Sequence, residues 1–131
     1  MRLLACIDPG VKYYGLALFE GQTLIAARKE HADCIHSVRA NLCVVERPRK
    51  ANDDRSTRGD IQDLEYAAGG YAAHFSSSKA VQASNVPKDI RHARALAALL
   101  PGELAVLPKQ KTHLKHVLCA VYIGLKELGR L

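Results

Sequence analysis

Residues 3–10, Leu3-Leu4-Ala5-Cys6-Ile7-Asp8-Pro9-Gly10, join a short apolar run to an acid and a Pro-Gly turn. The apolar run predicts a buried strand over residues 2–8. An acid at the end of a buried strand costs free energy unless its charge is compensated, and metal coordination is a common form of compensation. Asp8 is therefore the first candidate metal ligand.

A second acid has the same setting in Leu42-Cys43-Val44-Val45-Glu46-Arg47-Pro48. Residues 42–47 predict a strand with apolar side chains on both faces, which is typical of a central strand. If this strand lies parallel to the first, Asp8 and Glu46 are neighbours at one edge of the sheet. Two adjacent carboxylates repel each other and favour Mg²⁺ or Mn²⁺, which prefer oxygen ligands.

The remaining patterns predict an α/β fold with a mixed five-stranded sheet. A hairpin turn over Glu20-Gly21-Gln22 separates two predicted strands, and residues 48–59 lack periodicity and predict a loop. The other predicted elements are strands 13–19, 23–29 and 80–83, a short helix 34–41, a helix 60–75 capped by Asp60, and helices 86–100 and 112–128. This order predicts helices on both faces of the sheet and one domain over residues 1–131.

Length and composition agree with one small basic domain. The chain has 131 residues, 48% of them hydrophobic, a formal net charge of +6 and a pI of about 9.3. A basic domain of this size often binds a polyanion such as nucleic acid. The four cysteines lack CxxC spacing, so we expect no disulfide framework and a reducing compartment. The His31-x-Asp33-Cys34-x-His36 cluster leaves zinc open as a minor alternative. We find no membrane-span or signal-peptide pattern and expect a soluble protein.

Four segments, in order, resemble the RuvC-like Holliday junction resolvases of the RNase H-like superfamily, and the short chain is most similar to compact phage-type versions. The segments are Ile7–Gly10 with Tyr14–Ala17, Val45–Pro48, Val86–Arg91 and His116–Leu125. The resemblance implies an RNase H-like fold, a homodimer, and two Mg²⁺ or Mn²⁺ ions per active site. It also implies a DNA recombination endonuclease that nicks four-way junctions symmetrically, in the cytoplasm of a bacterial or phage-infected cell.

The same resemblance assigns Asp8, Glu46 and His116 as metal ligands. The family's closing helix carries an Asp three residues after the position of His116, and this chain has Cys119 there. A thiol suits Mg²⁺ badly. Three interpretations stay open: weak activity supported by Asp60 or Asp63, a site that the cysteine inactivates, or a protein that binds junctions without cutting. A related YqgF-like, RNA-processing nuclease is a further alternative.

Basic residues beside the predicted site suggest contacts to the DNA backbone. Lys115 could stabilise charge on the scissile phosphate. The candidate DNA-binding residues are Arg47, Arg49, Lys50, Arg55, Arg58, Lys88, Arg91 and Lys111. The small residues of 67–73, which include Gly69 and Gly70, suggest a dimer contact between helices; packing of the helix on its own sheet is the alternative.

Overall fold

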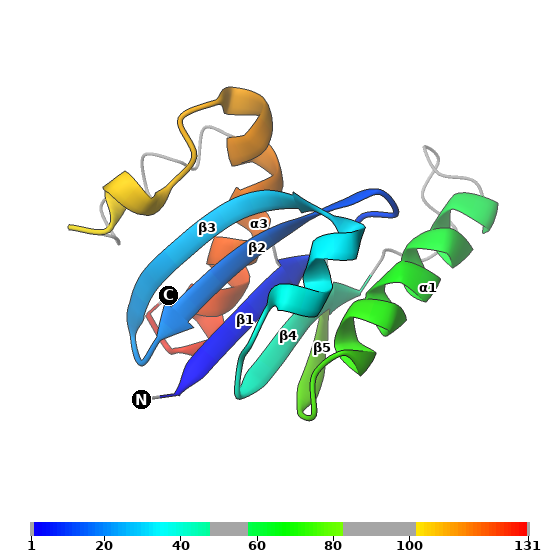
Figure 1. Cartoon of the computed structure of the whole chain (residues 1–131), viewed down its shortest axis with the longest axis horizontal. Helices are drawn as coiled ribbons and strands as arrows, with labels where there is room; N and C mark the ends of the chain where they lie inside the picture. The colour runs from blue at the N-terminus through cyan, green and yellow to red at the C-terminus, as the bar shows by residue number, and fades with distance from the viewer. Residues whose placement is uncertain (1, 48–57, 83–101, 131) are drawn as a thin grey trace.

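The structure, a computed structural model, describes residues 2–47, 58–82 and 102–130. The predicted helix 86–100 and most of the predicted loop 48–59 lie outside these residues. Figure 1 shows one sheet with helices on both of its faces. The strands are β1 (Leu3–Asp8), β2 (Tyr13–Glu20), β3 (Thr23–His31), β4 (Leu42–Arg47) and β5 (Ser78–Gln82). The helices are η1 (Ala32–Ser37), α1 (Arg58–Ala73), η4 (Leu104–Val106) and α3 (Lys111–Glu127).

The sheet has five strands in the order β3-β2-β1-β4-β5, as expected for a mixed sheet. β1 pairs antiparallel with β2 and parallel with β4, and β4 pairs parallel with β5. The predicted parallel neighbourhood of the first and fourth strands is therefore confirmed. Because both strands run in the same direction, their acidic ends reach the same edge of the sheet.

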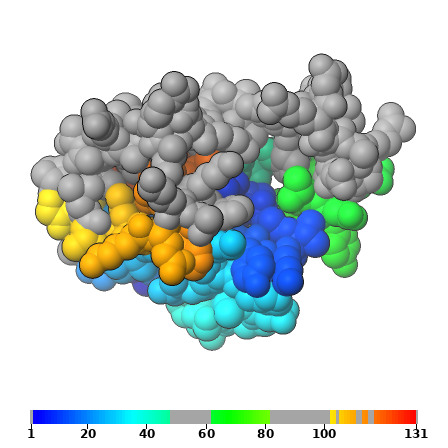
Figure 2. Space-filling model, turned by 90° about the horizontal axis from the view of Figure 1, so that it is seen from above, coloured from blue at the N-terminus to red at the C-terminus, as the bar shows by residue number. Residues whose placement is uncertain are grey.

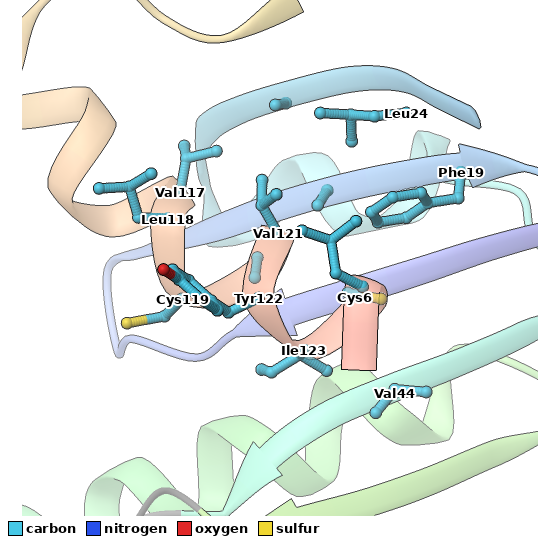
Figure 3. Packing of buried hydrophobic residues seen from close by; sticks show 14 of the residues in the cluster. Cys6, Phe19, Leu24, Val44, Val117, Leu118, Cys119, Val121, Tyr122 and Ile123 are labelled. Carbon is cyan, nitrogen blue, oxygen red and sulfur yellow. The ribbon is translucent and has the colours of Figure 1, made fainter. Parts of the chain in front are cut away.

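Each face of the sheet carries its own hydrophobic core. α3 packs against one face, where Cys6, Ala17 and Val44 meet Val117 and Val121 of the helix (Figures 1 and 3). The other face packs against α1 and η1. Since side chains alternate along a strand, this division decides which residues of β1 and β4 point towards α3.

Three predicted element boundaries need correction. α1 begins at Arg58, so Asp60 lies in its first turn and is not its N-cap. α1 ends at Ala73, and Ser78 belongs to β5, because this serine pairs with Cys43 of β4. The short helix forms over Ala32–Ser37 as a 3-10 helix and not over residues 34–41. In the described part of the chain, no helix has the length and apolar character needed to cross a membrane.

Gly124 sets how closely α3 approaches the sheet. A Cβ atom at this position would overlap the Phe19 ring, which is fully buried. Overpacking of this kind costs about 1–3 kcal/mol, so Gly124→Ala should lower the free energy of unfolding by that amount in urea titration. In Gly124→Ala/Phe19→Leu the smaller side chain at position 19 should recover part of the loss. Equal stability of Gly124→Ala and the unaltered protein would contradict the packing.

Candidate metal centre

Asp8 and Glu46 are delivered to one point by the pairing of β1 with β4. Ile7 pairs with Val45 in the parallel ladder, so the next residues on the two strands are neighbours. Both acids point towards α3, because they are two residues beyond Cys6 and Val44, which lie in the core under that helix. The sequence-based expectation that these carboxylates meet is confirmed.

Cys119 of α3 completes the cluster from above the sheet. A carboxylate oxygen of Asp8, one of Glu46 and the Sγ atom of Cys119 all lie within 4.8 Å of one another. Glu46 and Cys119 are each only 3% exposed, and Asp8 is partly buried. In Figure 3 the sulfur of Cys119 points away from Phe19 and the centre of the core. The cysteine therefore belongs to the acidic cluster as well as to the helix packing.

The chemistry of these donors fits a divalent cation. Two carboxylates in partly buried surroundings repel each other, and a bound cation would offset both the repulsion and the desolvation. Their oxygens suit Mg²⁺ or Mn²⁺, whereas a thiol suits softer ions such as Zn²⁺. Asp8 and Glu46 are thus the donors for a hard cation, and Cys119 is the member of the cluster that fits it poorly.

Two further cysteines lie on the strands that carry the acids, Cys6 on β1 and Cys43 on β4, without adding donors to the cluster. Burial raises the pKa of the Cys43 thiol to about 12, and burial also raises the pKa of Cys6 well above its ordinary value. Both thiols are therefore neutral at physiological pH and behave as small core residues. This agrees with the interpretation of their positions in apolar strands.

The turn after Asp8 is fastened to α1. The Tyr71 hydroxyl donates a hydrogen bond to the Gly10 carbonyl oxygen at 2.6 Å. Gly10 cannot carry a Cβ atom without overlap with the Tyr13 carbonyl oxygen. The Pro9-Gly10 pair predicts a tight turn from the sequence. No local pattern predicts that Tyr71, some sixty residues later on α1, supports this turn.

The structure does not bring every predicted residue to the cluster. Asp63 lies on α1, on the opposite face of the sheet, where it lines a cavity of about 480 Å³ with Val11 and Tyr66. A role for Asp63 at the metals is therefore not supported, because the sheet separates it from Asp8 and Glu46. Among the described residues, the acids, cysteines and histidines gather into a potential metal site only at Asp8, Glu46 and Cys119, which leaves the zinc alternative around Cys34 without support.

The structure describes the side chains of only some of the remaining candidate site residues. Arg47 is exposed at the end of β4 and lines a cavity of about 340 Å³ with Glu46, Glu65 and Lys79. His116 lies in α3 one turn before Cys119, but its side chain is not among those the structure describes. The same holds for the side chains of Arg58, Asp60, Lys111 and Lys115. Outside the described residues lie Arg49, Lys50, Arg55, Lys88 and Arg91.

Comparison with solved structures identifies the fold. The chain is similar to Thermus thermophilus RuvC in complex with a Holliday junction substrate, with 16% identity, coverage of 98% of this chain and 97% of that chain, and a TM-score of 0.58. A second Thermus thermophilus RuvC structure gives 16% identity, the same coverage and a TM-score of 0.52. No protein-family model matches the sequence, and a search of curated proteins finds no match.

These similarities define the class of fold. The five-stranded mixed sheet with helices on both faces is a RuvC-like, RNase H-like α/β fold, and this expectation is confirmed. Assignment to the phage-type branch stays a prediction.

Proposed function

We propose that this protein is a metal-dependent endonuclease that acts on four-way or branched DNA. The observation that carries the proposal is the convergence of Asp8, Glu46 and α3 at one edge of a RuvC-like sheet. The net charge of +6 suits a polyanionic substrate. The fold supports this class of activity, and the site residues support metal-assisted hydrolysis.

In this proposal Asp8 and Glu46 hold the cation and fix its position from two paired strands. Strands position a site more rigidly than loops do. When bound, a divalent cation supplies an activated water and stabilises charge on the phosphodiester. His116 is proposed as a further ligand and Lys115 as a group that stabilises charge on the phosphate, because both lie on α3 within one turn of Cys119.

A second function is favoured by one observation, the thiol of Cys119 inside the acidic cluster. A site that binds Mg²⁺ weakly would leave a protein that holds junctions without cutting them. This candidate keeps the same DNA surface, including Arg47 and the other basic residues proposed above, and differs only in the chemistry step.

One experiment separates the two functions. A labelled four-way junction and a linear duplex of the same sequence are incubated with the protein in Mg²⁺ and in Mn²⁺, and binding is measured in parallel in EDTA. Paired nicks in the junction alone support the nuclease. Tight junction binding without nicks supports the binding protein. Preference for structured RNA over both DNAs would contradict both proposals and favour the YqgF-like alternative.

We also propose a homodimer that pairs two α1 helices through their small residues. A Cβ atom added at Gly70 meets nothing within 4 Å among the residues that the structure describes, and Gly70 is exposed, so this surface has room for another helix. A twofold dimer would present two equivalent sites to two strands of a junction. One domain over residues 1–131 and a cytoplasmic location are part of the same proposal.

Gly70 gives a direct test of the dimer. In a helix exposed to solvent, Gly70→Ala should raise the free energy of unfolding by about 1 kcal/mol. If two helices meet there, Gly70→Leu should shift the sedimentation profile from dimer to monomer. A dimer that persists in Gly70→Leu, or a monomeric unaltered protein, would show that α1 is not the contact.

A further inference from the structure

A row of residues crosses the sheet at the height of the acidic cluster. Asp8 of β1 pairs with Gly15 of β2, and Gly15 pairs with Lys29 of β3. Directly paired residues point to the same face of a sheet. Lys29 therefore lies on the face of Asp8 and Glu46, two strands from Asp8, a distance of about 10 Å between strands.

Gly15, which lies between Asp8 and Lys29 in this row, is buried, and the exposed part of the row begins at the end of β2. The next residue of β2 on this face, Tyr13, is 42% exposed and pairs with His31. Its ring lies 4.7 Å from the Lys29 ammonium and 5.7 Å from the Lys12 ammonium, measured to the ring centroid. The His31 ring meets it edge-on at 5.5 Å. Figure 2 shows the β1–β2 hairpin, in blue, reaching the surface at this end of the molecule.

The two ammonium groups are not neutralised by carboxylates of the described chain. Among the described residues, no ion pair involves Lys12 or Lys29. The neighbouring acids are engaged elsewhere. A carboxylate oxygen of Asp33 lies 3.5 Å from Nδ1 of His31. Glu30 forms an ion pair with Arg28 and accepts a hydrogen bond from the Tyr14 hydroxyl. Tyr14 lies in the core of the opposite face, so Glu30 is directed away from Lys29.

We propose that Lys12 and Lys29, positioned by the Tyr13 ring, bind a backbone phosphate of the DNA strand next to the phosphate that a cation at Asp8 and Glu46 would hold. Cation–π contacts hold a lysine ammonium in place while leaving its N–H groups available to an oxygen anion. This inference rests on the proposed function, because it assumes that DNA is the substrate.

The salt dependence of junction binding tests the inference. Binding is measured in EDTA, between about 50 and 200 mM salt, for the unaltered protein, Lys12→Gln, Lys29→Gln and the control Lys126→Gln. Lys126 is exposed near the opposite end of α3 from the Gln110 N-cap. Loss of one phosphate contact should reduce the slope of log K against log salt by about 0.9. Because the two lysines share one phosphate, we expect a smaller reduction for each of Lys12→Gln and Lys29→Gln, the full reduction for the double variant Lys12→Gln/Lys29→Gln, and no change for Lys126→Gln.

Tyr13 is a positioning residue and has its own readout. Tyr13→Leu should lower the slope although it removes no charge, because the two lysines lose their support. Tyr13→Phe keeps the ring and should restore the slope. If Tyr13→Leu alters only thermal stability and leaves the slope unchanged, the ring has a structural role and the inference is wrong in this respect.

Neutral methylphosphonates at single positions locate the contact along the strand. At the phosphate that Lys29 contacts, the modification should lower the affinity of the unaltered protein for the junction. It should have little further effect on the affinity of Lys29→Gln. Additive losses at every position flanking the cut site would overturn the inference, as would unchanged slopes in both lysine variants. If the unaltered protein binds no junction at all, the proposed function fails first and this inference fails with it.

Discussion

Asp8→Asn should abolish tight Mn²⁺ binding and reduce junction cleavage about 1000-fold. Asp8 provides one of the two carboxylates of the cluster, and its oxygen lies within 4.8 Å of a carboxylate oxygen of Glu46 and of the Sγ atom of Cys119. Metal-ion catalysis supplies several kcal/mol of transition-state stabilisation, and each 1.36 kcal/mol corresponds to a factor of ten in rate. An amide keeps the shape of the carboxyl group but loses its charge.

The variant also separates function from folding. Asp8→Asn removes repulsion with Glu46, so in EDTA its melting temperature should equal or exceed that of the unaltered protein. Mn²⁺ binding is followed by electron paramagnetic resonance of the free ion, which gives a readout even if the chain does not cut. Glu20→Gln, at the end of β2 away from Gly15, is the matched control and should retain metal binding. Full Mn²⁺ affinity in Asp8→Asn would show that the cluster is not the metal centre.

The second large effect is expected from Cys119→Asp. This variant should increase Mg²⁺-dependent cleavage by about 10- to 100-fold, the effect that one interaction at a metal site typically has on activity. A third carboxylate replaces a soft donor by a hard one, and hard oxygen donors are what Mg²⁺ requires. The same change should weaken binding of Zn²⁺, for which the thiol is the better partner. Cleavage rate and metal affinity are measured for both ions.

Cys119→Asp carries a stability cost that the cation should relieve. Cys119 is 3% exposed and lies on α3, in the core between this helix and the sheet. A third negative charge there should lower the melting temperature in EDTA, and Mg²⁺ should restore it, because a ligand that binds only the folded state stabilises it. Cys119→Ser removes the thiol without adding charge and should show neither effect. Cleavage by the unaltered protein that equals that of Cys119→Asp would show that the thiol does not limit the site.

The acids of the candidate site could be predicted from the sequence because they sit at the ends of strands with a strong local signal. The apolar runs before Asp8 and Glu46 are buried, and their lengths define β1 and β4 closely. Parallel pairing of these two strands was sufficient to bring the acids together. A strand that is apolar on both sides has few alternatives to a central place in a sheet.

Helix α1 shows what local patterns left undecided. Helical spacing predicted its existence, but not which face of the sheet it covers. It lies on the face away from the acidic cluster, so Asp63 is remote from the site that sequence spacing alone allowed it to join. Cys119, by contrast, reaches Asp8 and Glu46 because Gly124 lets α3 lie close to the sheet. The side on which a helix packs depends on the whole sheet.

By itself the sequence determined the two acidic strand ends, the Pro-Gly turn and the basic charge, since each depends on neighbours in the chain. Only the tertiary structure decided that Lys29 shares a face with Asp8. The β2–β3 ladder shifts register between Leu18 and Phe19. Without that shift Lys29 would pair with Tyr14 and point to the opposite core, because a slip of one residue moves a side chain to the other face.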